Sequence, residues 1–339
     1  MTGIARSPFA ASQQLPELTR FTFTEYHMGI DARLVVYARN RNAAETACAA
    51  AFKRIAELEA VMSDYRPDSE LMRLCARAGG ERVPVSVDLY RVLWRAQTIS
   101  RQSDGAFDVT VGPLVQLWRA ARKAKKLPPA EEIKSARELV GWEKMRLGNR
   151  VVKLDTPGMR LDLGGIGKGY ASDEALKVLR ANATSSALIE MGGDIVLGDA
   201  PPGTRGWTIQ VPNAGDKELF LHNTAISTSG DTEQYVEIDG VRYSHVVDST
   251  TGKGLTQRVQ ATVIAKDGLT SDPLSTTLTI LSAARREKLM RQYPGVQTFI
   301  RVAADEPQNL LAALVGPQSG VGTGGFENAL HQRSILSVD

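Results

Sequence analysis

Glycine and aspartate residues gather in the stretch "MRLDLGGIGKGYASDEALKVLR", residues 159–180, where a short apolar segment precedes a helical pattern. Four of the six residues from 164 to 169 are glycines, so a ligand could approach the main chain closely there. The dipole of the following helix would favour an anionic ligand such as a phosphate. A tight connection into the helix, without any ligand, is the alternative interpretation.

Two common phosphate-binding motifs do not fit this stretch. The pattern GxxxxGK[ST] would need glycine at Asp162 and a hydroxyl residue at Gly169. The dinucleotide pattern GxGxxG would need glycine where Tyr170 stands. A phosphate bound here would therefore be held in neither a P-loop nor a dinucleotide fingerprint.

Oxygen ligands recur in the segment "GLTSDPLSTTLTIL". The spacing of Asp272, Ser275 and Thr276 places their side chains on one side of a helical turn. Hard oxygen ligands of this kind suit magnesium, particularly beside a phosphate. The same residues are also typical of a helix start, with Ser271 or Asp272 as the cap and Pro273 in the first turn. The two interpretations are compatible.

A candidate proton acceptor lies in "ISTSGDTEQYVEIDGVRYSHVVDSTTGKG", which opens with a predicted hydroxyl-rich turn. His245 lies at a predicted strand-to-loop transition, between Tyr243 and Asp248. An imidazole there could take a proton from a hydroxyl near neutral pH, although a purely structural histidine is the alternative. A separate segment, "EMGGDIVLG", places two glycines and Asp194 after a short apolar strand.

Two segments of the first half, "MSDYRPDSELMRL" and "SDGAFDVTVGPLVQLW", mix aromatic residues, acids and turn residues. The Tyr65 ring could stack on a planar ligand, and the Asp108 carboxylate could accept hydrogen bonds from a base or ring edge. Taken singly, each residue is better explained as a turn residue or a core aromatic.

The elements that must position these residues follow from hydrophobic periodicity. Apolar residues at helical spacing predict helices at 42–62, 87–100, 168–181 and 283–293. Period-two alternation predicts strands at 207–211 and 259–265, and one or two strands in "TFTEYHMGIDARLVVYA" with a turn or bulge at Gly29. Because the strands cluster, we predict an α+β fold with mixed, largely antiparallel sheets flanked by helices.

Composition restricts the class of protein. The 339 residues are 42% hydrophobic, and 41 basic against 38 acidic residues give a net charge of only +3, which argues against a nucleic-acid partner. The cationic run 119–126 has no interleaved aromatics and is predicted to be a solvated helix face and linker. Cys48 and Cys75 lack metal-site spacing, and Cys48 is expected in the core.

No apolar run reaches the roughly 20 residues of a transmembrane helix. The start of the chain also shows no signal-peptide apolar region and no lipidated cysteine. We predict a flexible N-terminal segment at 1–20 and a single domain at 21–339, or two intertwined subdomains within it.

Together these stretches resemble the ApbE family of FAD:protein FMN transferases, in the family's order, from about Met28 to beyond Leu281. The resemblance is carried by "DGAFDVTVGPLVQLW", "LDLGGIGKGYASD", "GGD", "STSGD", "SHVVDSTTG" and "SDPLSTTL". It implies an ApbE-like fold and a Mg²⁺-dependent enzyme that cleaves FAD and releases AMP. The FMN would be attached through a phosphoester bond to a threonine of an acceptor flavoprotein.

The resemblance also implies roles for individual residues. It implies FAD contacts at Met28, Tyr65, Ala106, Phe107, Asp108, Asp162, Lys168 and Val247. It implies that Mg²⁺ binds the main-chain oxygen of Gly165 and the side chains of Asp272 and Thr276, with Ser275 close by. His245 matches the general base for the accepting threonine, and Asp272 is the second residue expected to be catalytic.

Two positions depart from the family pattern. Ile30 replaces the threonine of the usual Met-Gly-Thr and removes a hydroxyl near the flavin. Ser275 stands where some members carry aspartate, and a neutral hydroxyl is a weaker magnesium ligand than a carboxylate.

Two other activities remain open at this point: an FAD pyrophosphatase that gives FMN and AMP, and a non-catalytic FAD-binding protein. Family members act on membrane-anchored redox subunits outside the cytoplasm. The resemblance therefore implies a location in the cell envelope, on the periplasmic side.

Overall fold

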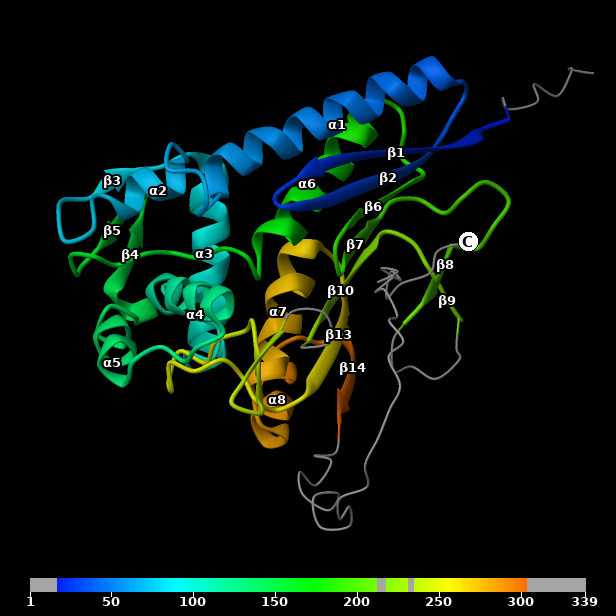
Figure 1. Cartoon of the computed structure of the whole chain (residues 1–339). Helices are drawn as coiled ribbons and strands as arrows, with labels where there is room; N and C mark the ends of the chain where they lie inside the picture. Colours follow the sequence, from blue (N-terminus) through cyan, green and yellow to red (C-terminus); the bar gives the residue numbers. More distant parts are fainter. Residues whose placement is uncertain (1–16, 212–217, 231–234, 304–339) are drawn as a thin grey trace, which may run out of the picture.

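The computed structural model describes residues 17–211, 218–230 and 235–303 (Figure 1). Its main feature is a seven-stranded sheet with the order β1-β2-β6-β7-β10-β13-β14, in which every neighbouring pair is antiparallel. The strands are β1 (Thr19–His27), β2 (Ile30–Ala38), β6 (Ala187–Met191), β7 (Asp194–Leu197), β10 (Thr224–Ser229), β13 (Val259–Ala265) and β14 (Gln297–Val302). The predicted α+β class with largely antiparallel sheet is confirmed.

Three helices cover one face of this sheet: α1 (Arg41–Met62), α6 (Gly167–Ala181) and α7 (Gly268–Ile280) (Figure 1). Helix α1 begins after Asn40, whose side chain accepts a 2.9 Å hydrogen bond from the Ala43 N–H. Its apolar face, which includes Cys48 and Phe52, is buried in the largest core cluster. The helix predicted at 42–62 and the core position of Cys48 are confirmed.

The opposite face of the sheet is covered by a hairpin of β8 (Trp207–Gln210) and β9 (Glu218–Leu221). Trp207 and Ile209 pack there against Val35 and Ile226 of the sheet. The sheet is therefore buried on both faces in this region, and the strand predicted at 207–211 is confirmed.

A second group of elements adjoins the helical face (Figure 1). Its helices are α2 (Glu70–Cys75), α3 (Val87–Gln102), α4 (Gly112–Ala124), α5 (Ala130–Glu138) and the 3₁₀ turn η1 (Trp142–Lys144). A small sheet joins β3 (Val83–Pro84), β5 (Val151–Leu154) and β4 (Met145–Gly148), and a hairpin joins β11 (Tyr235–Ile238) to β12 (Val241–Ser244). Helix α8 (Ala283–Met290) follows α7 and ends three residues before the predicted helix end.

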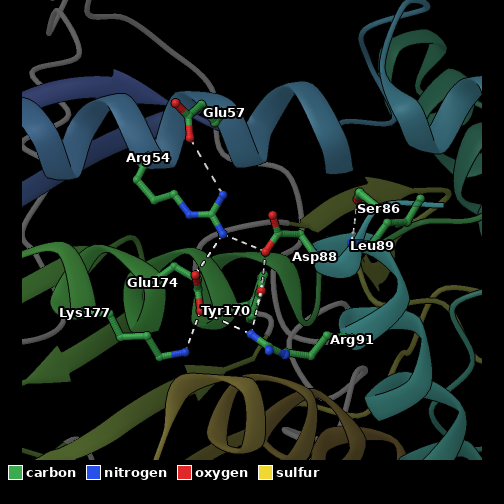
Figure 2. A network of polar contacts seen from close by, with 9 residues as sticks. All are labelled: Arg54, Glu57, Ser86, Asp88, Leu89, Arg91, Tyr170, Glu174 and Lys177. Carbon is green, nitrogen blue, oxygen red and sulfur yellow. Dashed lines mark hydrogen bonds and ion pairs between the residues drawn. The ribbon is translucent and has the colours of Figure 1, made fainter. Parts of the chain in front are cut away.

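An ion-pair network fixes α6 against α1 and α3 (Figure 2). Arg54 Nη2 lies 2.6 Å from Asp88 Oδ1 and 2.8 Å from Glu174 Oε2. The Tyr170 hydroxyl donates to the same Asp88 oxygen at 2.5 Å. The network joins three helices at the first turns of α6, which is the helix that the glycine-rich stretch opens.

Several boundaries differ from the predictions. Strand β1 begins at Thr19, inside the segment predicted to be flexible, whose residues 1–16 lie outside the described part of the chain. The hydroxyl-rich turn predicted after Ile226 is wrong, because 224–229 form strand β10 between β7 and β13. Met28 and Gly29 form the predicted turn between β1 and β2, with φ values of 51° and 82°.

Among the described residues, no helix combines the length and the apolarity needed to cross a membrane.

Candidate functional site

The starts of α6 and α7 touch through their backbones. A Cβ atom added at Gly169 would lie 2.2 Å from the Gly268 oxygen, and one added at Gly268 would lie 2.4 Å from the Gly169 oxygen. Only glycine fits at either position, because no real Cβ approaches an oxygen so closely. This close approach brings the glycine-rich stretch and the Asp272 helix into one site.

Helix α7 is capped by a residue of α6. The Asp173 carboxylate accepts 2.8 Å hydrogen bonds from the N–H groups of Gly268 and Leu269. The cap predicted at Ser271 or Asp272 is therefore wrong: α7 begins at Gly268, and Pro273 lies inside the helix. Burial raises the pKa of Asp173 to about 7, although the two amide hydrogen bonds act in the opposite direction.

The four positions expected to bind a metal lie together at this junction. Asp272 is 2% exposed, and its Oδ2 accepts a 3.0 Å hydrogen bond from the Gly169 N–H. Ser229 of β10 places its Oγ 2.8 Å from Ser275 Oγ and 3.1 Å from Thr276 Oγ1. A Cβ at Gly165 would lie 3.1 Å from Thr276 Oγ1, so this glycine lets the loop approach the hydroxyl.

The oxygen atoms at these four positions fit a magnesium ion by their chemistry. They are a carboxylate, hydroxyls and a main-chain carbonyl, all hard oxygens of the kind that Mg²⁺ prefers. No cluster of three histidine, cysteine, aspartate or glutamate side chains suited to a metal occurs in the described ranges. Burial and the neighbouring Asp194 raise the pKa of Asp272 to about 7, so an added cation would favour its ionised form.

Lys168 carries the positive charge of the junction. Its Nζ lies 2.9 Å from Asp194 Oδ2 and 3.9 Å from Asp272 Oδ2, and it donates a 3.1 Å hydrogen bond to the Gly164 oxygen. Burial alone would lower the pKa of Lys168, but the two carboxylates outweigh burial and raise it. The ammonium group therefore remains charged beside the glycine-rich loop.

Asp162 orders that loop and connects it to α4. Its Oδ1 accepts a 2.8 Å hydrogen bond from the Gly164 N–H, and its Oδ2 lies 2.9 Å from Arg119 Nη2. Arg119 also pairs with Asp64, and its guanidinium carbon lies 4.2 Å from the centroid of the Tyr65 ring.

The solvated face predicted for 119–126 is therefore wrong at Arg119. Tyr65 is 75% exposed, which leaves its ring accessible to a planar ligand.

Two apolar residues expected to contact FAD lie against the glycines. The Met28 methyl carbon is 3.4 Å from the position of a Cβ at Gly167. The Phe107 ring edge is 3.5 Å from the corresponding position at Gly165. Each glycine therefore leaves room for one of these side chains beside the loop.

Ala106 and Val247, two further residues expected to contact FAD, pack in different apolar clusters. Ala106 packs in the cluster that contains Leu274 of α7, whereas Val247 packs with Trp118. His245 directly follows the last residue of β12, which confirms its predicted place at a strand-to-loop transition. The loop is anchored to α4, since Trp118 Nε1 donates a 2.8 Å hydrogen bond to the Gly252 oxygen.

Asp108 lies at the wall of a cleft of about 460 Å³ that Trp142 and Ser249 also line. Its Oδ1 accepts hydrogen bonds from the Thr110 N–H at 2.8 Å and the Thr110 hydroxyl at 2.7 Å. Burial raises the pKa of Asp108 to about 6 despite these bonds. One of its carboxylate oxygens is thus already engaged within the protein.

The structure places at the site three residues for which the sequence motifs predict no role there. Asp194 was noted only as part of a glycine-glycine-aspartate pattern, and Ser229 only within the hydroxyl-rich stretch. Arg119 was included in the cationic run. A signal existed for the first two, since both stretches occur among the motifs of the ApbE resemblance. No local signal distinguished Arg119 from its basic neighbours.

Comparison with known proteins assigns the family. The chain is 34% identical to an FAD:protein FMN transferase of Vibrio cholerae over 238 residues, which are 68% of this chain and 71% of that protein. It is 31% identical to one of Treponema pallidum over 303 residues, 82% of this chain and 83% of that protein. The crystal structure of the Pseudomonas stutzeri flavinyl transferase ApbE, apo form, superposes with a TM-score of 0.75 at 29% identity, covering 86% of this chain and 94% of that one. A sequence model of the ApbE family matches residues 28–300, and the chain belongs to the ApbE family.

Proposed function

We propose that this protein is an FAD:protein FMN transferase, which cleaves FAD, attaches FMN to a threonine of an acceptor flavoprotein and releases AMP. The relatives named above support the activity. The observation that carries the assignment is the junction of α6 and α7, where a glycine-lined loop, Lys168, Asp272 and Thr276 come together. Such a site offers both main-chain groups and a cation to a diphosphate.

Four residues would hold the Mg²⁺ ion: Gly165 through its main-chain oxygen, and Asp272, Ser275 and Thr276 through their side chains. When bound, the ion would supply positive charge against the diphosphate of FAD. Ser229 fixes the hydroxyls of Ser275 and Thr276 by its hydrogen bonds. The Lys168 ammonium adds a second positive charge, and the Tyr65 ring offers a stacking surface for the planar flavin.

The transfer exchanges one phosphorus–oxygen bond for another. The threonine oxygen of the acceptor forms a bond to the phosphorus of the FMN half, and the bond from that phosphorus to the oxygen of AMP breaks. We assign to His245 the removal of the proton from the threonine hydroxyl, because an imidazole can accept it near neutral pH. The departing AMP oxygen keeps the electron pair of the broken bond.

The test is an incubation of the protein with FAD, MgCl₂ and a candidate acceptor, followed by AMP quantification and intact-mass analysis of the acceptor. The proposal expects one FMN on a threonine for each AMP released. His245→Ala should abolish labelling while FAD still binds. Unchanged labelling by that variant would remove His245 from the mechanism.

Two other outcomes would favour other activities. Release of free FMN and AMP at the same rate with and without acceptor would indicate an FAD pyrophosphatase. Stoichiometric retention of intact FAD in saturating MgCl₂ would indicate a non-catalytic FAD-binding protein. Following the family, we also propose that the protein acts in the cell envelope, on the periplasmic side, which fractionation of the source cells would test.

A further inference from the structure

The glycine-glycine-aspartate turn between β6 and β7 places Asp194 at the start of β7. Gly192 adopts a φ of 65°, and a Cβ at Gly193 would lie 2.6 Å from the Thr228 oxygen. The backbone conformation at Gly192 favours glycine, and the close approach of β10 leaves no room for a Cβ at Gly193. Asp194 follows at once, paired in register with Met191 on β6 and with Ser227 on β10.

The side chain of Asp194 lies on the helical face of the sheet. Residues paired across neighbouring antiparallel strands share a face, so Asp194 and Ser227 point to the same side. Ser227 Oγ lies 2.8 Å from Ser271 Oγ of α7, which identifies that side. The Asp194 side chain is 5% exposed, and Lys168 is its ion-pair partner at 2.9 Å.

We infer that Asp194 is a positioning residue, which acts by holding the Lys168 ammonium beside the Gly164 carbonyl and away from Asp272. The inference rests on the proposed function, because Lys168 is expected to contact the FAD diphosphate. Lys168 Nζ is 1.0 Å closer to Asp194 Oδ2, at 2.9 Å, than to Asp272 Oδ2, at 3.9 Å. Without the Asp194 charge, Asp272 becomes the nearest carboxylate, and the ammonium is attracted to it.

That shift would have two consequences. A direct Lys168–Asp272 pair would withdraw the ammonium from the diphosphate and would engage a carboxylate expected to bind the metal. Asp194 therefore influences FAD binding and transfer only through the position of Lys168, and its effect should vanish where Lys168 is absent. This dependence separates a positioning role from a general role in the stability of the hairpin.

The test is a double-mutant cycle with Asp194→Asn, Lys168→Gln and the double variant. The first readout is FAD affinity without added metal, measured by flavin fluorescence, and the second is kcat/KM for transfer. Asp194→Asn should weaken both by roughly 10- to 100-fold, the range for loss of a partner that orients a contacting group. The double variant should match Lys168→Gln within about twofold, because coupled residues are not additive.

Glu190→Gln is the matched control. Glu190 lies on the same hairpin, where its Oε2 accepts a 2.6 Å hydrogen bond from Arg33 Nε, and its register partner Ile195 belongs to the core on the opposite face. This variant loses a carboxylate of the hairpin without changing the Lys168 environment, so FAD affinity should stay within about twofold of the parent. Melting temperatures of all variants establish that each is folded, and Asp194→Ser replaces Asp194→Asn if the latter does not fold.

The inference is overturned if Asp194→Asn binds FAD as tightly as the parent, or if the double variant binds FAD much more weakly than Lys168→Gln alone. Failure of the proposed function has a different signature. In that case the parent protein would label no acceptor, while the cycle of metal-free FAD affinities would still report whether Asp194 acts through Lys168.

Discussion

The Asp173 carboxylate of α6 accepts a 2.8 Å hydrogen bond from the Gly268 N–H, the first amide of α7. A second 2.8 Å bond from the Leu269 N–H makes the contact bidentate. Because α6 carries the glycine-rich loop at its start and α7 carries Asp272 and Thr276, this contact sets the position of one half of the site relative to the other.

Replacing Asp173 by alanine should destabilise the protein and loosen the site. The substitution leaves two partly buried N–H groups at the start of α7 without this acceptor, and loss of a helix cap costs about 1–2 kcal/mol. Urea denaturation followed by circular dichroism measures the change. Equal unfolding midpoints for the variant and the parent would show that another group satisfies these amides.

Gly169→Ala should be far more damaging than an ordinary glycine-to-alanine change. Its Cβ would overlap the Gly268 oxygen and force the two helix starts apart, at a cost of about 1–3 kcal/mol. Gly148→Ala is the matched control, since the nearest atom to its added Cβ is the end of the Arg82 side chain at 3.9 Å. Thermal melts should show a large decrease in melting temperature for Gly169→Ala and little change for Gly148→Ala. Equal decreases for the two variants would argue against the tight contact between the helix starts.

Magnesium should stabilise the protein more at pH 8 than at pH 6. Burial raises the pKa of Asp272 from 3.8 to about 7, so its carboxyl binds a proton below that value, and the metal must displace it. In the metal-free protein this raised pKa means that the folded state binds a proton which the unfolded chain releases. The stabilisation of the folded state by this bound proton is therefore lost as the pH rises from about 4 to about 7.

Melting curves with MgCl₂, against KCl of equal ionic strength, measure this effect. The shift caused by magnesium should increase with pH in the parent protein and disappear in Asp272→Asn. A shift that persists in Asp272→Asn would place the metal elsewhere.

Arg119→Gln should weaken FAD binding by about tenfold, the lower end of the range for loss of a partner that orients a contacting residue. The change leaves Asp64 and Asp162 facing each other without a cation, which raises the pKa of Asp162 further than its burial and Asp64 already do. It also removes the guanidinium that supports the Tyr65 ring. Arg122→Gln, three residues later, is the control, because Arg122 forms no ion pair within the described ranges. Equal FAD affinities of the two variants in a fluorescence titration would contradict this role.

Elements such as α1 and β13 could be predicted from the sequence, because their apolar residues recur at helical and at period-two spacing. This spacing depends on the segment alone and not on its tertiary contacts. The errors occur where a distant residue decides the structure. Helix α7 begins at Gly268, three or four residues before the predicted cap, because Asp173, almost a hundred residues earlier, satisfies its first amides. Residues 224–229 form a strand because β7 pairs with 224–227 and β13 pairs with 225–229.

The candidate site shows the same limit. The residues of the glycine-rich stretch and of α7 could be found from their types and spacing, and the structure brings them together. Arg119 could not be found, because its distinction from Arg122 is only the presence of Asp64 and Asp162 across a tertiary contact. The predicted domain boundaries and the role of His245 stay predictions.

The junction of α6 and α7 is the proposed binding site for the diphosphate of FAD and its metal ion. A crystal structure of the protein soaked with FAD and MgCl₂ would locate both groups. We expect the diphosphate beside residues 164–168, with the ion between the Gly165 carbonyl and the side chains of Asp272 and Thr276. Density for the diphosphate or the ion at any other place would contradict this proposal.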